Sequence, residues 1–155
     1  MLSYDRKYHK NMIQCIIREG MLMRVEEHKE SLKQHKEAIF EWALEVKGIE
    51  NSQRIIGLHA SRAAIDLLAI YLQKTKKIGP GTQLNHRWFK SDKVNERIPS
   101  FPNKKSVLKR MIELEKLCEN LSYGSRKGKA EILKAVKLLQ EIEGMINKLM
   151  KNEKK

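Results

Sequence analysis

Residues 52–74 form the most apolar stretch of the sequence, and this stretch constrains the fold more than any other. Apolar side chains recur along it with helical spacing on almost every side, which leaves little room for a polar face. A helix that is apolar nearly all round has to be covered by neighbours on several sides. Its small residues, Ala60, Ala63 and Ala64, would allow another helix to approach closely. The stretch therefore predicts a central buried helix.

Further segments carry helical repeats of apolar residues and break at glycine, proline or asparagine. They cover residues 8–28, 31–47, 104–121 and 127–150. A chain of 155 residues is ordinarily one domain. We therefore expect an all-α fold, a bundle of four to five mostly antiparallel helices around the central one. In a single domain over 1–155, residues 1–28 would be an N-terminal extension helix and 31–150 the bundle.

The positive charge of the chain is concentrated in one quarter of it. The formal net charge is +13, and residues 74–110 hold eight lysines and three arginines against only Asp92 and Glu96. Such clustering is typical of a surface that binds nucleic acid or another polyanion. A second interpretation stays open, in which the charge is a lysine-rich solvated surface of the kind found in heat-adapted proteins.

Residues 75–103 predict a long basic loop that could include one short helix over residues 83–93. A connection of this length is usually functional or mobile. Cations and aromatic rings alternate in it. Proteins that bind single-stranded nucleic acids use cations to contact phosphates and aromatic rings to stack on bases. The candidate binding residues are Asn85, His86, Arg87, Trp88, Lys90 and Lys93. The alternative is that Trp88 and Phe89 hold the loop onto the bundle, since large aromatics commonly dock into cores.

Three polar residues interrupt the central helix on one stripe, namely His59, Arg62 and Asp66. The spacing of four allows Arg62 and Asp66 to form a structural ion pair, which would make their burial less costly. A functional alternative is a polar cleft that faces the basic loop. In that case the candidate catalytic residues would be His59, Arg62 and His86, because histidine exchanges protons near neutral pH.

Other site classes have no support in the sequence. Cys15 and Cys118 follow no disulfide or metal spacing, and Cys118 lies on an apolar stripe like a buried hydrophobe. The five histidines show no metal-ligand pattern, so we expect neither a metal nor a cofactor. The N-terminus lacks the apolar stretch of a secretory signal. We expect a cytoplasmic chain with no membrane association.

The sequence resembles the HEPN superfamily of small helical bundles over about residues 31–149. Two stretches carry the resemblance. Residues 58–69 (LHASRAAIDLLA) with 81–89 (GTQLNHRWF) are similar to that family's alanine-rich central helix and its following loop. Residues 114–124 (LEKLCENLSYG) are similar to its next helix, which often ends in Asp-Tyr-Gly.

This resemblance implies a homodimer that binds RNA or a nucleotidyltransferase-type partner protein. Some HEPN members are metal-independent ribonucleases with an Arg and a His four to six residues later. Here Cys118 stands at the position of that Arg, no His follows, and Ser122 replaces the Asp. We therefore predict a non-catalytic binding module. The alternatives are a ribonuclease with a displaced site of His59, Arg62, His86 and Arg87, or a purely structural subunit.

Overall fold

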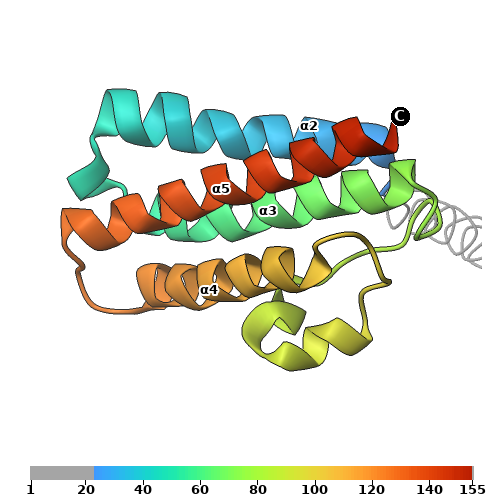
Figure 1. The fold of residues 1–155 in the computed structure, drawn as a ribbon. Helices are drawn as coiled ribbons and strands as arrows, with labels where there is room; N and C mark the ends of the chain where they lie inside the picture. The colour runs from blue at the N-terminus through green and yellow to red at the C-terminus, as the bar shows by residue number, and fades with distance from the viewer. Residues whose placement is uncertain (1–22, 155) are drawn as a thin grey trace, which may run out of the picture.

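Four long helices account for most of the computed structural model, which describes residues 23–154 (Figure 1). They are α2 (Val25–Lys36), extended by η1 (Glu37–Lys47), then α3 (Gln53–Lys74), α4 (Lys104–Tyr123) and α5 (Lys129–Glu153). Consecutive helices run in opposite directions (Figure 1). The predicted all-α bundle is confirmed, and the described residues contain no strand. Most of the predicted helix over residues 8–28 lies outside the described residues, and residues 25–28 belong to α2.

The helix α3 is central, as its composition predicted. It contacts α2, α4 and α5, and Ala60 and Ala63 are completely buried. It packs tightly against α4 at Gly57, where an added Cβ would lie 2.8 Å from the Leu121 Cβ. Among the described helices, α3 alone is long and apolar enough to cross a membrane, and 72% of its most apolar window is buried in the bundle. The core helix of a bundle has the same character.

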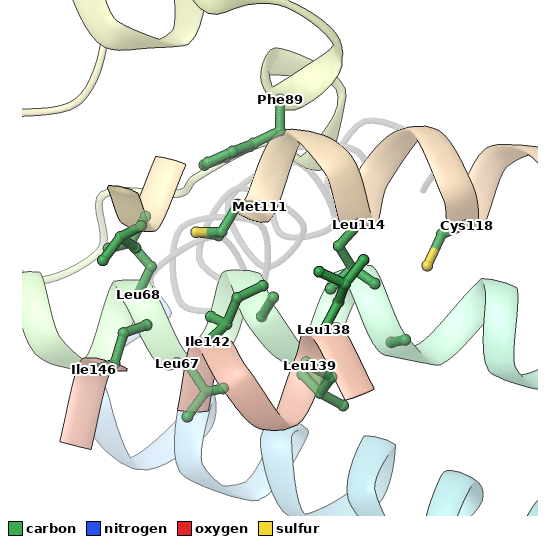
Figure 2. Packing of buried hydrophobic residues seen from close by; sticks show 14 of the residues in the cluster. Leu67, Leu68, Phe89, Met111, Leu114, Cys118, Leu138, Leu139, Ile142 and Ile146 are labelled. Carbon is green, nitrogen blue, oxygen red and sulfur yellow. The ribbon is translucent and has the colours of Figure 1, made fainter. Parts of the chain in front are cut away.

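The apolar stripes of α4 and α5 meet α3 in one hydrophobic core (Figure 2). Leu114 of α4 and Ile142 of α5 are completely buried, and burial of each such side chain contributes about 1.5–3 kcal/mol. Cys118 is 2% exposed within this core, as predicted. Burial raises the pKa of its thiol to about 12, so this cysteine is inert as a nucleophile.

The second helix is longer than predicted and changes its winding. It starts at Val25 instead of residue 31, and from Glu37 it continues as a π-helix to Lys47. Its wider turn separates side chains that an α-helix would align, so Trp42 is 52% and Val46 68% exposed. The helical spacing of apolar residues in 31–47 predicts Trp42 and Val46 on one apolar stripe with Leu32, Ile39 and Ala43, and this prediction is wrong for both. Gly48, at φ 85°, ends the helix as its position predicted.

The connection between α3 and α4 folds onto α4. It contains two 3₁₀ turns, η3 (His86–Lys90) and η4 (Asp92–Glu96), in place of the short helix over residues 83–93. Its apolar side chains are buried in the common core, and Figure 2 shows Phe89 among them. They are Phe89, Val94, Ile98 and Phe101. This anchoring fixes where the polar side chains of the connection lie.

Candidate functional site

Two hollows meet at Arg62 on the polar stripe of α3. The first, here called the basic groove, has a volume of about 300 Å³ and lies between α3, η3 and α4. The second, here called the histidine cavity, has a volume of about 200 Å³ and lies between α2, α3 and the residues before η3. Arg62 and His86 line both hollows. The fold thus brings together two of the three predicted catalytic candidates, while His59 lines neither hollow.

The basic groove combines cations with a buried carboxylate. Arg62, Arg87 and Lys90 line it, and Lys90 Nζ donates to Glu119 Oε1 at 2.8 Å. Glu115 is 5% exposed, and its Oε1 lies 2.8 Å from Nδ1 of His86. An ionised carboxylate only accepts hydrogen bonds, so Nδ1 carries the proton and Nε2 of a neutral His86 is left as an acceptor. The groove is therefore suited to hold an anion next to a proton acceptor, the His86 ring.

The rim of the basic groove carries an exposed aromatic ring. Tyr123, at the end of α4, lines the groove and is 83% exposed. Within residues 23–154, neither Arg62 nor Arg87 forms an ion pair with an acidic side chain. Charge for phosphates and a ring face for a base are thus available on one surface.

Asp66 pairs with histidines of α2 and not with Arg62. His28 Nδ1 lies 2.7 Å from Asp66 Oδ1, and His35 Nε2 lies 3.7 Å from Oδ2. Arg62 Nη1 donates to the Leu58 carbonyl oxygen at 2.7 Å. The predicted Arg62–Asp66 ion pair is therefore not formed. The order Arg before Asp along a helix is unfavourable for such a pair, and α2 offers Asp66 a buried partner instead.

His59 forms a pair with His35. Their Nδ1 atoms lie 2.8 Å apart, so one ring donates the proton and the other accepts it. Burial lowers the pKa of His59, and the neighbouring His35 and Arg62 lower it further. Burial also lowers the pKa of His35, against the opposing effect of Asp66. His59 thus belongs to a polar contact between α2 and α3, and not to the basic groove.

The remaining predicted binding residues take different positions. Phe89 is docked in the core, as the alternative interpretation of the loop stated. Trp88 packs against the core from its edge, with the Arg97 guanidinium carbon 4.9 Å from its ring centre. Asn85 Oδ1 accepts from the Arg87 backbone N–H at 2.9 Å and caps η3. Lys93 lies on η4 and does not line the groove.

The residues of the two hollows that were not predicted as site residues include His28, His35, Glu115 and Tyr123. His28 was assigned to the extension helix, although its spacing of seven from His35 places both on one helical face. Glu115 interrupts the apolar stripe of α4, and a lone acid there is a signal for a buried partner. Tyr123 carries no such signal, because its exposure depends on where α4 ends.

Metal ligation has no basis in the described part of the chain, since no three or more His, Cys, Asp or Glu side chains there are grouped to hold an ion. The comparisons with known proteins give no assignment. No protein-family model, no curated protein and no solved structure matches this chain.

Proposed function

We propose that this protein is a non-catalytic module that binds single-stranded RNA in the basic groove. The observation that carries the proposal is that Arg62, Arg87 and Lys90 line one groove with the exposed ring of Tyr123. The arginines would contact phosphates, because neither is neutralised by an acid within residues 23–154. Tyr123 would stack on a base.

Anisotropy of a labelled ten-nucleotide single-stranded RNA, measured over a series of salt concentrations, tests this proposal. We expect the logarithm of the binding constant to fall linearly with the logarithm of the salt concentration. Arg87→Ala should weaken binding and reduce the magnitude of the slope by about 0.7, the contribution of one phosphate contact in a single strand. Arg62→Ala should do the same.

Lys129→Ala is the matched control, because Lys129 is exposed at the start of α5 and lines neither the basic groove nor the histidine cavity. It should leave the slope unchanged. If the wild-type protein leaves the RNA unbound at low salt, or if Lys129→Ala and Arg87→Ala have equal effects, the groove is not the binding site.

A second candidate function is metal-independent cleavage of RNA in the same groove. The observation that favours it is the hydrogen bond between His86 and the buried Glu115 beside Arg62. In this mechanism His86 Nε2 takes the proton of a ribose 2′-hydroxyl, whose oxygen attacks the adjacent phosphorus. The bond to the 5′-oxygen breaks, that oxygen takes a proton from water, a 2′,3′-cyclic phosphate forms, and protonated His86 returns its proton to the solvent. Arg62 would neutralise the charge on the phosphate.

Cleavage in the presence of a chelator decides between the two functions. If cleavage occurs, His86→Ala should abolish it, and Glu115→Gln should reduce it with little loss of RNA affinity. If RNA binds and stays intact, the non-catalytic module is the correct description. The wild-type protein and the His86→Ala variant are purified by the same procedure. This comparison controls for a contaminating nuclease.

The resemblance to HEPN proteins extends the proposal to assembly. We infer a HEPN-like homodimer, with a nucleotidyltransferase-type protein as a further candidate partner. Light scattering after size-exclusion chromatography would give twice the chain mass of 18.2 kDa for a homodimer. A mass of one chain across the accessible concentrations would contradict it.

A further inference from the structure

The histidine cavity adjoins the basic groove but takes no part in the phosphate contacts proposed there. Arg62 and His86 form the boundary between the two hollows, since both residues line both. Any phosphate held by Arg62 would therefore lie at the entrance of the histidine cavity. A group attached to that phosphate could enter it.

The walls of this cavity are of two kinds. Met23, Ile65 and Leu84 provide apolar surface, while Ser31 of α2 adds a hydroxyl group that can donate or accept. The volume of about 200 Å³ is enough for one flat ring system. Flat apolar faces with polar edges are the chemistry of a nucleobase, and proteins bind an unstacked base by these two kinds of contact.

The wall of the cavity also contains a buried acceptor that lacks a donor. His28 is 2% exposed, and its Nδ1 is used by Asp66. Its Nε2 is the one buried side-chain nitrogen or oxygen in the described part of the chain without a hydrogen-bond partner. In a neutral ring whose Nδ1 donates to the carboxylate, Nε2 is an acceptor. It would be satisfied by an N–H group, which every nucleobase carries on its pairing edge.

We propose that the histidine cavity receives one unstacked base of the RNA strand that the basic groove binds. Arg62 and His86 hold the phosphate next to that base, the apolar walls contact its faces, and His28 Nε2 accepts a hydrogen bond from its edge. This inference rests on the proposed RNA binding and adds a base-recognition site to it. A free nucleotide has the same chemistry, so the test has to separate it from a strand.

The experiment compares two labelled ten-nucleotide strands by anisotropy at one low salt concentration. One is oligouridine, and the other has the same ribose–phosphate backbone without bases. Wild-type protein should bind oligouridine about tenfold more tightly, the range of one stacked base. Ser31→Trp fills the cavity from α2, where Ser31 is half-buried, and should reduce this preference to the part that stacking on Tyr123 contributes, while the affinity for the abasic strand stays the same.

Gln34→Trp is the matched control, because Gln34 is exposed on the same helix and lines neither the histidine cavity nor the basic groove. It should keep the full preference, and circular dichroism of both variants confirms the fold. Leu84→Trp fills the cavity from its other side and should reproduce the effect of Ser31→Trp.

Several outcomes would overturn the inference. If both tryptophan variants keep the preference, the base is recognised elsewhere, with Tyr123 as the next candidate. If wild-type protein binds both strands equally with normal salt dependence, the base site and the stacking on Tyr123 both fail, while the phosphate contacts proposed in the basic groove stand. If neither strand binds, the proposed function itself fails. If uridine 5′-monophosphate competes as well as the ten-nucleotide strand, the cavity is a site for a free nucleotide.

Discussion

The interface between α4 and α5 and the interface between α2 and α3 bury different chemistry. Between α4 and α5 the interior is apolar, and charged contacts such as Arg110–Glu141 lie at the surface. Between α2 and α3 a carboxylate and a histidine are buried, in the His28–Asp66 pair. Buried polar pairs stabilise less than apolar packing of the same volume, because both groups are desolvated. The first interface thus contributes mainly to stability, and the second holds polar groups that line the histidine cavity.

The largest effect is expected in the apolar interface. Ile142→Ala should lower the free energy of unfolding by about 2–5 kcal/mol, because the removed methylenes leave a cavity in a completely buried site. Urea denaturation followed by circular dichroism measures it. RNA affinity of the folded variant should not change. A loss below 1 kcal/mol would mean that α4 and α5 do not carry the stability of the bundle.

A smaller loss is expected in the polar interface. Asp66→Ala should lower the free energy of unfolding by about 1–3 kcal/mol, because the buried Nδ1–H of His28 loses its acceptor. The same denaturation experiment measures it. In the double variant with His28→Ala the losses should be less than additive, since both remove one interaction. Strict additivity would show that the two side chains do not interact.

The polar interface should also make stability depend on pH. Burial holds the pKa of His35 and of His59 below the ordinary value of 6.5, so the unfolded chain binds more protons as the pH falls through that value. Their contribution to stability is full above pH 6.5 and is lost below it. Urea midpoints between pH 8 and pH 5 should therefore decrease less in His35→Gln/His59→Gln than in the wild type. Parallel curves for the two proteins would refute this assignment.

The smallest effect is expected from the surface charges of the apolar interface. Arg110→Ala should change the free energy of unfolding by less than about 1 kcal/mol, because both partners of its ion pair with Glu141 are about half exposed. The change should shrink further in high salt. A loss as large as that of Asp66→Ala would remove the distinction between the two interfaces.

The sequence was sufficient for the features that depend on local periodicity. The central position of α3 and the burial of Cys118 follow from apolar repeats that each helix carries by itself. The exposure of Trp42 was missed because the change to a π-helix alters the period within one segment. The partners of Asp66 were missed for a different reason. They depend on how α2 is aligned along α3, because His28 and Asp66 are 38 residues apart in the chain. This alignment is set by tertiary packing.

The His35–His59 contact couples the proton binding of the two rings. Two rings that share a proton between Nδ1 atoms 2.8 Å apart are two proton sites with negative cooperativity, because the charge gained by one ring disfavours the charge on the other. Such a pair fills over a wider range of pH than two independent histidines. The charge at the junction of α2 and α3, beside Arg62, therefore changes gradually with pH and not over a narrow range.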